Sequence, residues 1–167
     1  MTSNDLEKDS RACARRPRVA PWLAAVGAAL LAAPGAYAGL GQGVASVATD
    51  HEVLHGVAQA VIAHADYDVH EITLADETRV REYVSHAGTV FGVAWSGRSN
   101  PDLTVLLGQH YAQYVSAAGA RRASTHKVFV MSTGDLVMSV VKLPRGFTGT
   151  AHVPALLPSG VLARDIR

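Results

Sequence analysis

Residues 67–115 read YDVHEITLADETRVREYVSHAGTVFGVAWSGRSNPDLTVLLGQHYAQYV, and no other part of the chain is patterned so densely. Alternating apolar and polar side chains over 67–74 and 78–85, followed by the mainly apolar run 89–95, predict three strands joined by tight turns. The segment 89–95 has apolar or small side chains on both faces, which predicts the central strand of a sheet. The apolar phase of 67–74 shifts near His70-Glu71, which predicts a twist or a bulge at that point.

An amphipathic helix is predicted directly after these strands, over residues 101–118. Asn100 is a favourable N-cap, Pro101 suits the first helical position, and Asp102 complements the helix dipole. The apolar positions recur at three- and four-residue steps: Leu103, Leu106, Leu107, Tyr111, Tyr114 and Val115. Because burying one leucine stabilises a fold by roughly 1.5–3 kcal/mol, we expect this stripe to be hidden against the sheet, with Phe91 and Trp95 facing it.

The N-terminal part of the same domain is less clearly patterned. Residues 39–48 are rich in glycine and are expected to form a loose lead-in. Thr49 and Glu52 have the spacing of a capping box, which predicts a short helix near residues 50–56. The segment 57–64 fits a continuation of this helix and fits a strand equally well, so both interpretations stay open.

Three more strands are predicted at 127–132, 136–142 and 147–153. The remaining tail, 154–167, contains two prolines and is expected to be an ordered extended cap outside the ladder. These elements predict an α+β fold. A curved antiparallel sheet of about five or six strands would wrap one main helix, 101–118, with a short N-terminal helix beside it.

Residues 1–38 have the composition of a secretory signal peptide. A basic segment, 11–18, precedes an apolar run, 22–33, and Ala36-Tyr37-Ala38 offers the small-x-small pattern that signal peptidase cleaves. The run of a dozen apolar residues spans only about 18 Å as a helix, which is too short for a hydrocarbon core of roughly 30 Å. We therefore predict cleavage after Ala38 and one mature domain over 39–167. Retention of the segment as a tether to the inner membrane is the alternative.

The mature chain would have ten Lys and Arg against eleven Asp and Glu, because five of the fifteen basic and three of the fourteen acidic residues precede Gly39. The formal charge is then −1 with neutral histidines, which argues against nucleic acid as a partner. Cys13, the single cysteine, also leaves with the signal. The mature domain would therefore have neither a disulfide nor a thiol nucleophile.

His51-Glu52-Val53-Leu54-His55 matches the zinc motif H-E-x-x-H. On a helix, the two histidines would lie one turn apart and hold Zn²⁺, while Glu52 would activate a bound water. Three arguments oppose this interpretation. No third ligand follows at the spacing of the longer zinc motifs, Glu52 already suits the capping box, and no sheet precedes the helix to align a substrate. We therefore expect no metal site here.

Other chemistry-bearing residues are expected to be structural. His51, His55, His64 and His70 are interpreted as separate, half-exposed histidines. The pairs His70-Glu71 and Arg81-Glu82 are predicted to face each other across the first hairpin. Phe91, Trp95, Tyr111 and Tyr114 are predicted core residues, although a sheet face with these aromatics is also the default place for a pocket. No serine has the context of a nucleophile elbow, and no glycine-rich segment has that of a phosphate loop.

Several short motifs occur in a fixed order along the chain. They are YxVHE at 67–71, REYV at 81–84, GTVFGVAW at 88–95, PDL at 101–103, LLG at 106–108, and VPALLPxGV at 153–161 followed by Asp165-Ile166. In these motifs the chain resembles a family of short secreted bacterial proteins that is known only as a domain of unknown function. The resemblance implies a signal peptide, a bacterial envelope or secreted location, and no assigned activity or catalytic residues. The family usually has a glycine in the first hairpin turn, where this chain has Asp76-Glu77.

The functional expectation follows from these points. We expect a protein exported across the inner membrane to the periplasm or beyond, non-enzymatic, serving as an envelope accessory or binding protein. Its partner would be an envelope protein or a small ligand, with no cofactor and no membrane span after signal cleavage. The alternative is a small zinc-dependent hydrolase that uses His51, Glu52 and His55.

Overall fold

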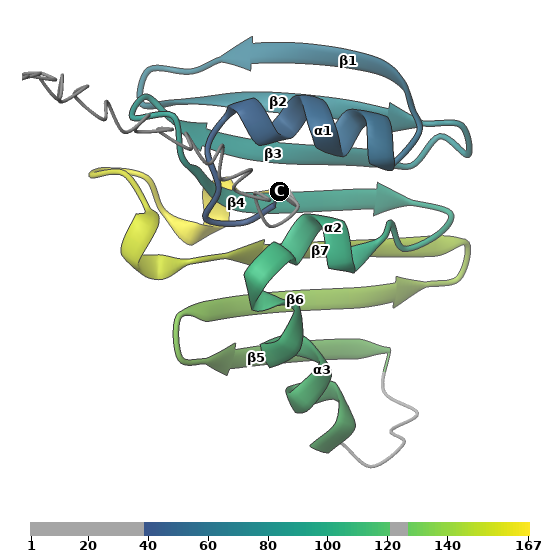
Figure 1. Ribbon diagram of the computed structural model, residues 1–167. Helices are drawn as coiled ribbons and strands as arrows, with labels where there is room; N and C mark the ends of the chain where they lie inside the picture. The colour runs from purple at the N-terminus through teal and green to yellow at the C-terminus, as the bar shows by residue number, and fades with distance from the viewer. Residues whose placement is uncertain (1–38, 121–126) are drawn as a thin grey trace, which may run out of the picture. The chain divides into compact units, whose positions relative to one another are not determined.

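The computed structural model describes residues 39–120 and 127–167, which form a seven-stranded antiparallel sheet with helices on one face (Figure 1). In sheet order the strands are β1 (Gly56–Ala63), β2 (Tyr67–Leu74), β3 (Arg79–Ser85), β4 (Val90–Gly97), β7 (Gly146–His152), β6 (Leu136–Leu143) and β5 (Val128–Thr133). The α+β class is confirmed, but the predicted number of strands is too low. The extra strand is β1, in the segment that fitted both a helix and a strand. The predicted signal peptide, 1–38, lies outside the described residues.

The strands β2, β3 and β4 form within two residues of their predicted bounds, and β4 is the central strand. Of the twist or bulge predicted near His70, the bulge does not form, because β2 and β3 pair without a shift. The apolar phase changes because β2 is buried on both faces, with Val69 in one hydrophobic cluster and Ile72 in another. A bulge lies in β4 instead: Tyr83 pairs with Gly92 and Val84 with Val90, so Phe91 is the extra residue.

The main helix is interrupted, in contrast to the single helix predicted over 101–118. It consists of α2 (Leu103–Leu107), the 3-10 helix η1 (Gly108–His110) and α3 (Tyr111–Ala120). Gly108 breaks it with φ 49° and ψ −123°, a conformation that favours glycine. The N-cap is Asp102, whose side chain accepts a hydrogen bond from the Thr104 N–H at 2.8 Å. The predicted cap, Asn100, instead accepts one from the Trp95 indole at 3.0 Å.

The apolar stripe of these helices meets the sheet as predicted for most of its length. We call this side of the sheet the helix face. Leu106 and Leu107 are fully buried in one cluster with Trp95, and Tyr111 and Tyr114 pack half-buried against it. Val115 is an exception, with 48% of its surface exposed. On the sheet, Phe91 was predicted to face this stripe, but its position in the bulge turns its side chain to the opposite side.

The N-terminal segment is tied into the fold, so the expectation of a loose lead-in is wrong. Leu40 is fully buried, and its N–H donates to the Leu106 carbonyl at 3.0 Å. The Val44 N–H donates to the Gly88 carbonyl at 2.8 Å, and α1 (Ala45–Val53) begins directly afterwards. This helix has no side-chain cap, and Thr49 lies inside it, so the predicted capping box does not form. Tertiary contacts, rather than local capping, decide where α1 begins.

The opposite side of the sheet is covered by residues 153–167, which we call the tail. The tail runs through two 3-10 turns, η2 (Pro154–Leu156) and η3 (Ala163–Asp165), and adds no strand, as predicted. Its Val161 and Ile166 pack in a small cluster on this tail face. A Cβ on Gly92 would lie 2.6 Å from Ile166 Cδ1, so glycine is needed for the tail to approach β4. No helix within the described ranges is long and apolar enough to cross a membrane.

Candidate functional site

The HEVLH motif does not adopt the geometry of a zinc site. The helix α1 ends at Val53, and His55 has a left-handed backbone with φ 55°, so the two histidines do not share a helix. The ring of His51 lies over Gly56, where a Cβ would come within 2.5 Å of His51 Cδ2. In residues 39–120 and 127–167, no group of three or more His, Cys, Asp or Glu side chains is placed to hold a metal ion.

A shallow hollow of about 380 Å³ lies beside His55, and its acidic residues are already engaged. Asp76 accepts hydrogen bonds from the Ser99 hydroxyl and from the Thr78 N–H, and these bonds lower the pKa of Asp76. Asp102 accepts the capping bond described above. Both carboxylates therefore serve the local fold, and the hollow offers no catalytic pair.

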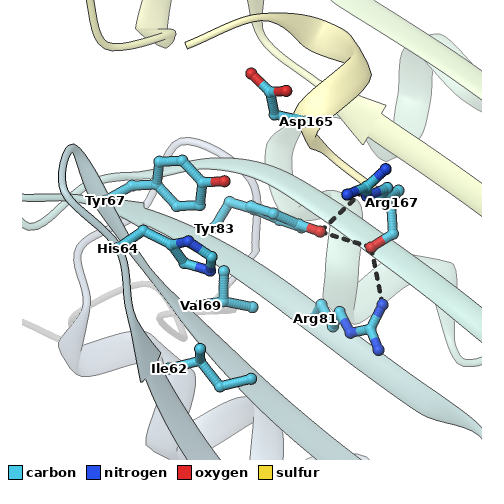
Figure 2. A pocket seen from close by; sticks show the side chains of 8 residues that line it. All are labelled: Ile62, His64, Tyr67, Val69, Arg81, Tyr83, Asp165 and Arg167. Atoms are coloured by element: carbon cyan, nitrogen blue, oxygen red, sulfur yellow. Dashed lines mark hydrogen bonds between the residues drawn. The ribbon is translucent and has the colours of Figure 1, made fainter.

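A second pocket, of about 220 Å³, opens on the tail face and brings together aromatic and charged side chains (Figure 2). Its residues come from the end of β1, from β2 and β3, and from the tail: Ile62, His64, Tyr67, Val69, Arg81, Tyr83, Asp165 and Arg167. Because β2 and β3 are adjacent strands, alternate residues of each point to the same face. The tail then closes the remaining side. We call this the tail-face pocket.

Aromatic rings form one wall of the tail-face pocket. The rings of His64 and Tyr67 stack, with centroids 4.7 Å apart and planes inclined by 21°. The Tyr67 ring lies 5.8 Å from that of Tyr83 and meets Phe91 edge-on at the same distance. Phe91 is fully buried, and its ring packs against the rings of both Tyr67 and Tyr83. The four rings therefore support one another in one continuous aromatic wall.

Hydrogen bonds hold the polar wall in place (Figure 2). The Tyr83 hydroxyl donates to the main-chain oxygen of Arg167 at 2.6 Å and accepts from the Arg167 N–H at 2.9 Å. Arg81 Nη1 donates to the same oxygen at 2.9 Å. Burial raises the pKa of Tyr83 above 10.0, so its hydroxyl stays protonated. The neutral phenol of Tyr83 and the guanidinium of Arg81 thus bind the main chain of the tail at Arg167.

One predicted charge pair supports this wall. Arg81 Nε donates to Glu71 Oε2 at 2.7 Å, and the two residues are cross-strand partners, as predicted. His70 and Glu82 are partners in the same ladder. Glu82, however, is fully buried under α1, and its carboxyl oxygens do not form the ordinary cross-strand charge pair that was predicted.

The sequence did not indicate where the pocket lies. Trp95 is 2% exposed and belongs to the core of the helix face, as predicted. The pocket forms instead around Tyr67 and Tyr83, which face the tail. The alternation of Val69, Arg81 and Tyr83 with helix-facing residues could have indicated that these three side chains share the other face of the sheet. It could not indicate the tail side of the pocket, because Arg167 lies 84 residues after its partner Tyr83 in the sequence.

Comparison with known proteins places the chain in a family. No curated protein matches it significantly, and no solved structure does so. The sequence model of one family, described as "Protein of unknown function (DUF2844)", matches residues 36–166. This range includes all the strands and helices described above as well as the tail-face pocket up to Asp165. The chain therefore belongs to the DUF2844 family, in agreement with the resemblance inferred from its motifs.

Proposed function

We propose that the protein is an exported, non-enzymatic binding protein of the cell envelope, and that the tail-face pocket is its ligand site. The observation that carries this proposal is the supported aromatic wall opposite a hydrogen-bonded polar wall. A pocket that combines apolar walls with a few fixed polar groups is the usual form of a small-molecule site. The order of basic, apolar and small residues over 1–38 supports export.

The pocket favours a small molecule with one flat ring. A cavity of about 150 Å³ accommodates benzene, so about 220 Å³ accommodates a single ring with a few polar substituents. The ring would stack beside Tyr67 and His64. Polar substituents would reach the Arg167 guanidinium and the Asp165 carboxylate on the tail side (Figure 2). Opposite charges at this side favour a ligand that carries both donor and acceptor groups over a strongly charged one.

The pocket groups support binding rather than catalysis. The Tyr83 phenol is held protonated, and Arg81 is committed to Glu71 and to the tail. Neither group is arranged as a base next to a nucleophile. Hydrolysis of a peptide or ester library by the purified protein would contradict this part of the proposal.

The binding proposal is tested by screening single-ring compounds with amino, hydroxyl or carboxyl substituents, using NMR chemical shifts of the protein. We expect perturbations at residues 62–69 and 81–83, and at least a tenfold loss of affinity in Tyr67→Ala. Phe147→Ala is the matched control, because this ring lies on β7 next to Lys142 and away from the pocket. Perturbations that map elsewhere, or equal losses in both variants, would reject the site.

Export is tested separately. N-terminal sequencing of the accumulated protein should begin at Gly39. A chain that begins at Met1 and fractionates with the inner membrane would instead support the tethered alternative.

A further inference from the structure

Two carboxyl groups meet in the interior of the helix face, where apolar side chains are expected. Asp50 lies on the buried side of α1, between Val47 and the cap residue Leu54, and is fully buried. Glu82 occupies the middle of β3, between Val80 and Val84 on the same face, and is fully buried as well. A buried charge without a partner is costly, so this pair needs a physical explanation.

The four oxygens of the two carboxyl groups are buried without a hydrogen-bond partner in the described part of the chain. The two groups are within hydrogen-bonding reach of one another. None of their four oxygens receives a bond from an N–H or O–H donor of the described residues. Since two carboxylates bring no donor between them, a bond can form only when one of the pair carries a proton.

The elements packed around the pair contribute little charge. On β2 the cross-strand partner of Glu82 is His70, and on β4 it is Val93. Burial lowers the pKa of His70, and the nearby Asp68 only partly opposes this effect, so His70 is neutral at neutral pH. The buried residues of α2 are apolar, and His51 on α1 is turned onto Gly56. No cation from these elements therefore neutralises the two carboxylates.

We propose that Asp50 and Glu82 form a buried proton-binding site, in which one shared proton fastens α1 to the sheet and whose loss releases that helix. Glu82 is the proton carrier: its O–H donates to the Asp50 carboxylate. Burial, followed by the neighbouring Asp50, raises the pKa of Glu82 well above 4.5. Burial raises the pKa of Asp50 to about 6, although its bond from Glu82 acts in the opposite direction.

The release is local, because both flanks of α1 are anchored independently of the pair. Before the helix, the Val44 N–H is bonded to the Gly88 carbonyl. After it, β1 pairs with β2 from Gly56 onward. Between these anchors, α1 rests on the sheet through the side chains of Val47, Asp50 and Leu54. When both carboxyls ionise, their repulsion acts on this segment alone.

The pH dependence follows from the direction of the two shifts. Both pKa values are higher with α1 docked than in the open state, where the groups meet water. The proton therefore stabilises the docked state fully below about pH 4. This stabilisation weakens as the pH rises through about 6, where Asp50 ionises and the single shared proton on Glu82 remains, and it is lost as the pH rises through the higher pKa of Glu82. The site favours a docked helix in acid and a released helix in alkali.

Amide hydrogen exchange of the protein, in the form that accumulates in cells, tests this proposal. After correction for intrinsic rates, we expect amides of residues 47–54 to be at least about tenfold less protected near pH 8 than near pH 5. The reason is that the docking equilibrium changes by about a factor of ten for each pH unit between the pKa of a carboxyl in the open state and its pKa in the docked state. Amides of β3 and β4 should keep their protection. Glu82→Gln places a permanent donor opposite Asp50, so it should keep α1 protected near pH 8.

Glu52→Gln is the matched control, since it makes the same chemical change at an exposed position of the same helix. It should retain the pH dependence of the parent protein. If Glu82→Gln does not fold, Asp50→Asn applies the same test from the helix side. Equal protection of α1 near pH 5 and pH 8 in the parent protein would overturn the proposal. Restoration of protection by Ca²⁺ or Mg²⁺ near pH 8 would also overturn it, because the site would then bind a cation.

Discussion

Among the described residues, seventeen buried hydrophobic side chains form one cluster on the helix face, drawn from the sheet, the helices, the segment before α1 and Val153 at the start of the tail, whereas the tail face buries six under a tail without regular strands. The helix face is closed by apolar packing. The tail face is closed partly by hydrogen bonds to a tyrosine hydroxyl and a guanidinium, and it leaves a pocket. One side of the sheet therefore supplies most of the stability, and the other is free to carry a binding site.

The largest expected effect is on the helix face. Leu106→Ala removes a fully buried side chain from the larger cluster, which should lower the free energy of unfolding by about 2–5 kcal/mol. Urea denaturation followed by circular dichroism measures this change. A loss smaller than that of Ile166→Ala would contradict the conclusion that the helix face supplies most of the stability.

Ile166→Ala makes the corresponding change on the tail face. Ile166 is 3% exposed, but it belongs to a short segment that can settle into the space. We expect a loss at the lower end of the same range, about 2 kcal/mol, in the same denaturation experiment. Binding of a ring compound should weaken as well, because the tail forms one side of the pocket. Unchanged binding would show that the tail is not part of the site.

Tyr83→Phe sharpens the comparison by removing hydrogen bonds without removing volume. The variant loses the bond donated to the Arg167 main-chain oxygen and the bond accepted from the Arg167 N–H. At about 0.5–1.5 kcal/mol for each of the two bonds, we expect a loss of about 1–3 kcal/mol. Exchange of the Arg167 amide should accelerate while that of β3 does not. Equal acceleration in both places would indicate general destabilisation instead.

The smallest effect is expected from Glu71→Gln. Its partner Arg81 has 35% of its side chain exposed, so solvent screens the pair. The expected loss is about 0.5 kcal/mol, and it should shrink in high salt. A thermal denaturation series at low and high ionic strength measures both. A loss above about 2 kcal/mol would mean that Glu71 acts mainly through Arg81 on the tail.

The regular strands could be predicted because their patterns are local. The meander of β2, β3 and β4 has clear turns and alternation, and its bounds were recovered closely. The break at Gly108 was not predicted, because the leucine and tyrosine positions continue the helical spacing across it. The start of α1 was also missed, since it is set by the bond between Val44 and Gly88 rather than by a capping side chain.

The two sites depended on contacts that are distant in sequence. The tail-face pocket needs Arg167 beside Tyr83, and the buried acid pair needs Asp50 over Glu82. Glu82 was predicted to belong to an ordinary cross-strand charge pair with His70-Glu71, but its side chain is fully buried. The placement of α1 over β3 distinguishes the half-buried carboxyl of Glu71, which binds Arg81, from the fully buried carboxyl of Glu82.

The bulge at Phe91 limits how the central strand can evolve. With this extra residue, Val90, Val93 and Trp95 lie on the helix face, while Phe91 and Ala94 lie on the tail face. Loss of one residue between Gly88 and Trp95 would exchange the side-chain directions of the rest of the strand. It would turn the indole of Trp95 away from Leu106. Members of the family should therefore tolerate substitutions in this strand far better than a change in its length.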